Sequence, residues 1–125
     1  MKRVINTSQA PAAIGPYSQA IEVNGTLYIS GQIPVKPSEG KIVATEITGQ
    51  TEQVFENIRA ILKEADYTFA DVVKSTVFLS DIADFSKMND VYKQYYQTEC
   101  PARSAFAVKA LPLGALVEIE TIAAK

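Results

Sequence analysis

The segment from Glu46 to Ala65 constrains the fold most, because an amphipathic helix of this length needs a second layer to cover its apolar side. Its apolar residues recur at spacings of three, four and seven, which gathers them on one helical stripe. These residues are Ile47, Val54, Ile58, Ile61, Leu62 and Ala65. The segments on either side of this predicted helix therefore decide the fold class.

Those flanking segments are rich in β-forming residues. AIEVNGTLYIS, residues 20–30, places two short β-rich runs around Asn24-Gly25, a pair that suits the positive φ angles of a type I′ hairpin turn. VVKSTVFLS, residues 72–80, is β-branched and bounded by aspartates, which indicates a strand. Between the hairpin and the helix, GQIPVKPSEGK, residues 31–41, holds two prolines and two glycines and is expected to be a loop.

A second helix is expected after the strand, from Asp81 to about Thr98. Asp81 suits the N-cap, and an apolar stripe follows it at helical spacing. This stripe consists of Phe85, Met88, Tyr92 and Tyr95. After Pro101, two strands at about 103–111 and 116–123 complete the chain, and Val4 with Ile5 adds an edge strand.

The order of these elements is hairpin, helix, strand, helix, strand, strand, which is an α+β pattern. We expect one domain over residues 1–125, built as a six-stranded mixed sheet. Right-handed crossovers place both helices on the same face of this sheet. The other sheet face then has no covering layer from the chain itself.

Side-chain alternation in the last two strands predicts what that uncovered face carries. If Phe106 packs under the helices together with Val117, then Arg103, Glu118 and Glu120 lie together on the uncovered face. A face that mixes these charges with Ala, Leu and Ile is neither a core nor an ordinary wet surface. We expect another subunit to bury it partly, with the charges lining a cleft.

Arg103 offers a planar fork of donors that matches the carboxylate of a small ligand. The alternative is an intramolecular salt bridge to Glu118 or Glu120, which spacing alone favours and which contributes little when exposed. Glu118 could hold a water or shuttle a proton if burial raises its pKa toward neutrality. Its alternative is an ordinary surface or paired carboxylate.

Three further sites in the sequence, one of them a residue pair, each allow two interpretations. Tyr17 follows a Gly-Pro turn, where its phenol would close over a ligand or pack against the sheet. Ser30-Gly31 follows a β-rich run, where glycine permits close approach of a ligand to backbone N–H groups, although a plain turn also accounts for it. Cys100 directly precedes a proline and has no visible basic partner, which favours a structural thiol over a nucleophile.

The composition narrows the chemistry further. The chain has no histidine, which removes Ser-His-Asp and Cys-His nucleophile pairs, His-ligated zinc and histidine acid-base catalysis. Its 12 basic and 14 acidic residues show no basic cluster, so nucleic acid is not an expected partner. No segment reads as a signal peptide or a membrane helix, and a single cysteine forms no intrachain disulfide, so a cytoplasmic location is expected.

Several motifs together resemble the Rid family, also called YjgF, of reactive-intermediate imine deaminases. The most specific is PARSAFAVKALPLGALVEIE, residues 101–120. APAAIGPYSQA, YISGQIP and DFSKMNDVYKQYY extend the resemblance in order over nearly the whole chain. The resemblance implies a chorismate-mutase-like fold and a homotrimer whose sheets form a central barrel, with helices outside and ligand sites between subunits.

The same resemblance implies a reaction and a set of residue roles. The reaction is hydrolysis of 2-iminobutanoate and 2-iminopropanoate to 2-oxo acids and ammonia, without a cofactor or metal. Arg103 would bind the substrate carboxylate and Glu118 would position the attacking water, while Tyr17 lines the cleft. Backbone near Ser30-Gly31 and Ala105 would contact the substrate, and whether Phe85 and Asn89 reach the ligand stays open.

One position departs from the family pattern. Many members carry cysteine two residues after the arginine, where this chain has Ala105, so thiol-dependent activity or redox control is not expected here. Two other functions remain as alternatives. A non-catalytic carboxylate-binding regulatory module would need Arg103 but not Glu118, and an RNA-acting translation inhibitor is disfavoured by the acidic balance and the lack of histidine.

Overall fold

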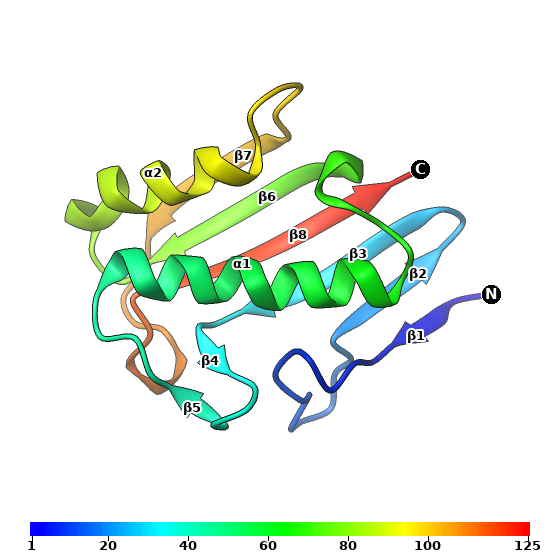
Figure 1. Ribbon diagram of the computed structural model, residues 1–125, viewed down its shortest axis with the longest axis horizontal. Coiled ribbons are helices and arrows are strands. Elements are labelled where there is room, and N and C mark those ends of the chain that lie inside the picture. Colours follow the sequence, from blue (N-terminus) through cyan, green and yellow to red (C-terminus); the bar gives the residue numbers. More distant parts are fainter.

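The computed structural model, which describes residues 1–125, has a mixed sheet with two α-helices on one of its faces (Figure 1). This confirms the predicted α+β class and the six-stranded sheet. Only the pairing between β6 and β7 is parallel. The strands, in their order across the sheet, are β1 (Arg3–Ile5), β2 (Ala20–Val23), β3 (Thr26–Gln32), β8 (Val117–Ala124), β6 (Val72–Leu79) and β7 (Ala102–Ala107).

The predicted hairpin joins β2 to β3. Asn24 and Gly25 have φ angles of 50° and 78°, the conformation that a type I′ turn requires. Gly25 is also needed for space, because a Cβ atom there would lie 2.5 Å from the carbonyl oxygen of Lys125. The turn therefore lies directly against the C-terminus of the chain.

Helix α1 (Ile47–Glu64) buries the predicted apolar stripe against the sheet. Glu46 is its N-cap, where the side chain accepts a hydrogen bond from the N–H of Gly49 at 2.9 Å. Asn57 is fully buried on the same helix and donates to the carbonyls of Ile33 and Val35, which fixes the segment after β3. Residues of the core with no solvent exposure include Leu27, Val54, Phe55, Ile58, Ile61, Val77, Leu79, Val117 and Ile119.

Helix α2 (Phe85–Tyr95) is shorter than predicted. Asp81 caps a preceding 3₁₀ turn, Ile82–Asp84, by accepting from the N–H of Ala83, so it does not cap α2 itself. The expectation of a plain loop over residues 31–41 is also wrong in part. β3 extends to Gln32, and β4 (Val35–Lys36) pairs with β5 (Lys41–Ile42), with prolines just outside the paired residues.

The orientation predicted for β7 is wrong. β7 pairs with β6 and not with β8, and Arg103 lies opposite Ser75, a buried residue beneath the helices. Phe106 lies opposite Phe78, which in turn lies opposite Glu118 on β8. Arg103 therefore faces α2, whereas Phe106 and Glu118 face the uncovered side of the sheet.

The uncovered sheet face is rich in apolar side chains. Val4, Tyr28 and Phe106 lie on it with 59%, 49% and 46% of their surface exposed. Glu118 and Glu120 share this face, as predicted from their spacing. A surface of this composition is suited to contact with another protein surface.

A cluster of polar contacts joins both chain ends to the end of α1. Glu22 accepts hydrogen bonds from Arg3 Nε at 3.2 Å and from the Tyr67 hydroxyl at 2.9 Å. Arg3 also donates to the carbonyl of Ala65, and the Lys125 ammonium lies 4.7 Å from the centre of the Tyr67 ring. The hydrogen bond from Tyr67, followed by that from Arg3, lowers the pKa of Glu22 below its ordinary value of 4.5.

Because its pKa is lowered on folding, Glu22 stabilises the protein above about pH 4.5, and this stabilisation is lost as the pH falls through the folded pKa. Glu22→Gln should therefore lower Tm at pH 7, and the difference from the unmodified protein should shrink toward pH 3. Thermal unfolding followed by circular dichroism across this range measures both. Glu39→Gln, at an exposed side chain without contacts, is the control; an equal Tm difference at pH 7 and pH 3 would contradict the linkage.

Candidate active site

Arg103 lies on a shelf of side chains from one face of α2. Its guanidinium carbon is 4.6 Å from the centre of the Tyr92 ring and 5.4 Å from that of Phe85. Arg103 Nη1 donates to Asn89 Oδ1 at 2.7 Å. The remaining guanidinium N–H groups have no partner within the chain, and the residue is exposed. The fork is thus held from one side and open to an anion on the other.

The three shelf residues, Phe85, Asn89 and Tyr92, are spaced at i, i+4 and i+7, so they share one helix face. Whether Phe85 and Asn89 reach the ligand was left open by the sequence, and Tyr92 was expected only as part of the apolar stripe of the second helix. Their spacing was visible in the sequence, but their relation to Arg103 depends on the β6–β7 pairing. The structure adds Phe85, Asn89 and Tyr92 to the surroundings of Arg103.

The backbone beside Arg103 is also free to bind a ligand. β7 is the last strand of the sheet, and the N–H of Val108 donates to Leu79 on β6. In a strand of a parallel pair, the N–H and C=O groups of one residue both point toward the paired strand, and those of the next residue both point away from it. The N–H and C=O groups of Arg103 and Ala105 therefore point away from β6, along the open edge. The half-buried Ala105 side chain packs against the core.

Glu118 lies on β8, on the uncovered sheet face. It is half-buried, and this burial, followed by the negative charge of Glu120, raises its pKa above 4.5. No hydrogen bond or ion pair holds its carboxylate within the chain. A desolvated carboxylate with a raised pKa is suited to accept a proton from water near neutral pH.

Gly31 is adjacent to Glu118 because of a β-bulge in β3. Ser30 and Gly31 lie between two paired positions, Ile29 with Thr121 and Gln32 with Ile119, so two residues oppose one. A Cβ atom on residue 31 would overlap Oε2 of Glu118 and lie 3.0 Å from its Cδ. Glycine at this position therefore leaves the space that the carboxylate occupies.

Tyr17 lies at a cavity, whereas the side chain of Ser30 makes a hydrogen bond within the fold. Tyr17 is 54% exposed and lines a cavity of about 570 Å³ together with Gly31. The exposed Ile14 and Leu113 lie at the same cavity. Ser30 is occupied within the fold, because its hydroxyl donates to the Ser18 carbonyl at 2.6 Å.

The predicted cluster of Arg103 with Glu118 and Glu120 does not exist within one chain. Arg103 faces α2, the two glutamates face the opposite side of the sheet, and β6 separates β7 from β8. An intramolecular salt bridge from Arg103 to either glutamate is excluded for the same reason. The chain instead presents two separate parts of a site, a guanidinium on one face and a carboxylate on the other.

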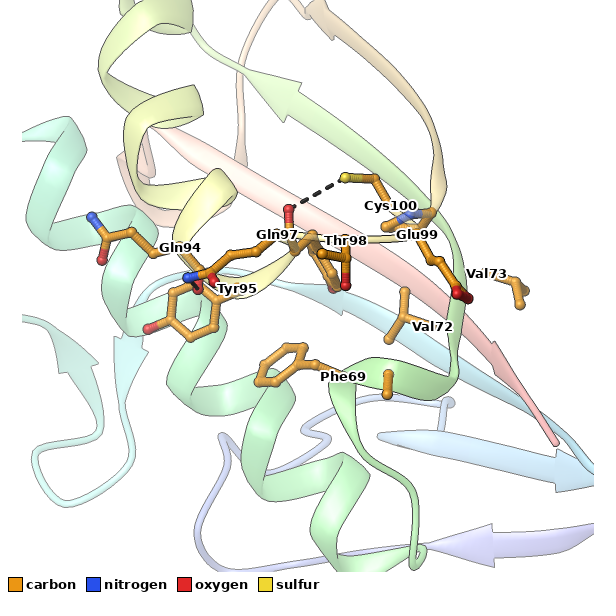
Figure 2. Close-up of a pocket in the computed structure, with 12 residues that line it drawn as sticks. Phe69, Val72, Val73, Gln94, Tyr95, Gln97, Thr98, Glu99 and Cys100 are labelled. Atoms are coloured by element: carbon orange, nitrogen blue, oxygen red, sulfur yellow. Dashed lines mark hydrogen bonds between the residues drawn. The ribbon is translucent and has the colours of Figure 1, made fainter.

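A cavity of about 840 Å³ lies elsewhere (Figure 2). It is bounded by the end of α2, the loop that follows and the start of β6, with Phe69 and Val72 on its floor. The Cys100 thiol is exposed there and donates to the carbonyl of Tyr96. Glu99 is its one charged lining residue, so it offers no cation for an anionic ligand. No three potential metal-ligating side chains lie together anywhere in the chain.

Neither α1 nor α2 combines the length and apolar character that a membrane span requires.

The family model described as endoribonuclease L-PSP matches residues 7–125. A goat protein named 2-iminobutanoate/2-iminopropanoate deaminase is 54% identical over 123 residues, which are 98% of this chain and 90% of the goat protein.

Two solved structures share the fold along the whole chain. A Yersinia pestis protein of unknown function, described as a member of the conserved Rid family, has a TM-score of 0.97, 52% identity and 100% coverage of both chains. Escherichia coli TdcF with bound serine has a TM-score of 0.93 and 40% identity, with 98% of each chain covered. The fold, the C-terminal motif around Arg103 and Glu118, and these matches agree, and the chain belongs to the endoribonuclease L-PSP family, the Rid or YjgF family.

Proposed function

We propose that this protein hydrolyses 2-imino acids, 2-iminobutanoate and 2-iminopropanoate, to 2-oxo acids and ammonia. The observation that carries the proposal is the Arg103 guanidinium, which is held by Asn89 and Tyr92 with its other donors free. A small α-carboxylate matches such a fork. The name of the goat relative and the serine bound to the related Escherichia coli protein support the same substrate class.

In the proposed reaction, Arg103 binds the carboxylate and Glu118 orients a water molecule against the imine carbon. The water oxygen forms a bond to that carbon while Glu118 accepts one proton from the water and passes it to the imine nitrogen, which becomes an amine. The remaining hydroxyl proton is transferred to this amine as the C–N bond breaks, so that ammonia leaves and the C=O group of the 2-oxo acid forms. Positioning and one proton acceptor are sufficient for an already electrophilic carbon.

We infer that the site forms between copies of the chain, in a homotrimer. Arg103 and Glu118 lie on opposite faces of one sheet, so the two act on one small substrate only if a second copy supplies one of them. The exposed apolar residues of the uncovered face provide a surface for this contact. Tyr17, Gly31 and the free backbone at Ala105 would complete the cleft, with Ser30 fixing the strand behind it.

The family description also names an endoribonuclease. The deaminase proposal is preferred because the Arg103 guanidinium has no neighbouring cluster of lysines or arginines. A protein that binds an RNA backbone needs such a cluster to contact successive phosphates. We therefore propose a small-molecule substrate and no nucleic acid partner. We also propose the cytoplasmic location that the sequence leads us to expect. Incubation of the protein with single-stranded RNA, followed by electrophoresis, tests this preference directly.

Arg103→Ala should reduce kcat/KM by roughly 100-fold, because a charged bidentate contact contributes ~3 kcal/mol. Glu118→Ala should lower kcat for the same reaction. The assay generates 2-iminobutanoate with threonine dehydratase, traps it with semicarbazide and measures release of 2-oxobutanoate. The proposed function fails if the unmodified protein does not accelerate this release.

A mixture of the two inactive variants tests the shared site. When Arg103→Ala and Glu118→Ala chains are unfolded together and refolded, about one quarter of the sites should carry both native residues, because each site takes one from each of two chains. Activity should return to about that fraction. If both residues came from one chain, every site would lack one of them, and the mixture would stay inactive.

The raised pKa of Glu118 predicts a pH dependence. Because the carboxylate must be ionised to accept a proton, kcat/KM should fall as the pH drops through a pKa above 4.5. Glu120→Gln removes the neighbouring negative charge, lowers the pKa of Glu118 and should move this acidic limb to lower pH. Rates corrected for uncatalysed hydrolysis measure the shift; an unmoved limb would show that Glu120 does not influence the catalytic group.

Gly31→Ala should fold but lose activity. The added methyl group displaces the end of the Glu118 side chain, which is flexible, and a misplacement of ~1 Å costs up to about 100-fold in rate. We expect kcat to fall at least about tenfold with Tm little changed. Gly49→Ala, at a remote and less tightly confined position in α1 where the nearest atom would be 3.0 Å from the added Cβ, should keep its activity within about twofold. Full activity of the Gly31→Ala variant would show that the position of the Glu118 carboxylate does not matter for the reaction.

A further inference from the structure

Tyr92 lies directly beneath the Arg103 guanidinium. The distance of 4.6 Å from the guanidinium carbon to the ring centre is the shortest of the five cation–ring contacts in the protein. Tyr92 is 6% exposed while Arg103 is exposed, so the ring forms a buried floor under a side chain that reaches solvent. A cation over a desolvated aromatic face is more strongly attracted than one at the surface.

The Tyr92 ring is itself fixed from below. It makes an edge contact with Phe55 of α1, at 5.7 Å between ring centres and 73° between planes. It also packs against Tyr96 at 4.9 Å. Phe55 has no solvent exposure, so the floor under Arg103 is continuous with the main core between α1 and α2. Closely packed aromatic rings leave this floor little freedom to move.

The Tyr92 hydroxyl does not explain why an aromatic residue stands at this position. It is buried near the Ser75 hydroxyl without a well-formed hydrogen bond, and the hydroxyls of Ser75, Tyr96 and Thr121 are likewise without one. Ser75 lies opposite Thr121 in the sheet, which places these two unpaired hydroxyls on the same buried face. A buried hydroxyl without a partner destabilises the fold, so the ring face is the part of Tyr92 with a favourable contact.

Arginine has many rotamers, and a ligand that must immobilise it loses affinity. Here the buried Tyr92 ring restricts movement of the guanidinium toward the core between the helices, and Asn89 holds Nη1 at 2.7 Å. We propose that Tyr92 is a positioning residue for Arg103, whose ring holds the fork ready for the carboxylate of the substrate. This proposal rests on the proposed function, in which Arg103 binds that carboxylate.

The proposal predicts a defect in binding more than in chemistry. Tyr92→Leu should raise KM for the imino acid by about three- to thirtyfold, the range that a cation–ring contact supports, with kcat little changed. The Kd of the product 2-oxobutanoate, measured by calorimetry, should rise by the same factor. Tyr92→Phe keeps the ring face and removes the unpaired hydroxyl, so its KM and Kd should stay within about twofold of the unmodified protein.

Tyr96→Leu is the matched control, because it removes a ring and an unpaired hydroxyl from the same cluster without a contact to Arg103. It should lower Tm by about as much as Tyr92→Leu while raising KM and Kd far less than Tyr92→Leu does, because the Tyr92 ring stays under Arg103 on its contact with Phe55. Tyr92→Met serves as a second variant if Tyr92→Leu does not fold, since a flexible side chain refills the space without an aromatic face.

The proposal is overturned if a folded Tyr92→Leu or Tyr92→Met variant binds 2-oxobutanoate normally. It is equally overturned if Tyr96→Leu raises Kd as much as Tyr92→Leu, because the effect would then be loss of packing alone. The Arg103→Ala variant in the same titration distinguishes a failure of the positioning role of Tyr92 from a failure of the proposed function. If Arg103→Ala binds normally, the carboxylate site itself is wrongly assigned; if only the Tyr92 variants bind normally, Arg103 keeps its role and the positioning by Tyr92 is refuted.

Discussion

The parallel pairing of β7 with β6 is the interaction on which the candidate site depends. Because Arg103 lies opposite the buried Ser75, the guanidinium faces α2 and rests on Tyr92. The same pairing makes β7 an edge strand and leaves the backbone groups of Arg103 and Ala105 free along that edge. A shift of this pairing by one residue would turn Arg103 to the other face of the sheet and separate it from its shelf.

The carboxylate part of the site depends on a second local irregularity. The bulge in β3 lets Ile29 and Gln32 both face the core while Gly31 lies against Glu118. Burial without a hydrogen bond raises the pKa of this carboxylate, which is unfavourable for folding near neutral pH and useful for accepting a proton. The two parts of the site are fixed differently. Neighbouring side chains hold the Arg103 guanidinium, whereas no hydrogen bond or ion pair within the chain holds the Glu118 carboxylate.

Much of the fold follows from local patterns. The Asn24-Gly25 turn, the apolar stripe of α1 and the β-branched run of β6 were each predicted correctly, because the physical cause lies within a few residues. The short β4–β5 pair was missed, because prolines on either side of Val35–Lys36 are typical of loops and each of the two strands is only two residues long. Asp81 was recognised as a cap, but only the structure distinguishes the 3₁₀ turn from α2.

The amino-acid sequence alone predicts the order of the two helices and six main strands, the residue types available for chemistry and the motif that marks the family. It also determined that Glu118 and Glu120 share a face, since strand alternation is a property of the backbone. The face that Arg103 takes depends on long-range strand pairing, because alternation relates residues within a strand and does not say which neighbour the strand joins. That neighbour is β6, and its pairing with β7 places Arg103 and Glu118 on opposite sides of one sheet.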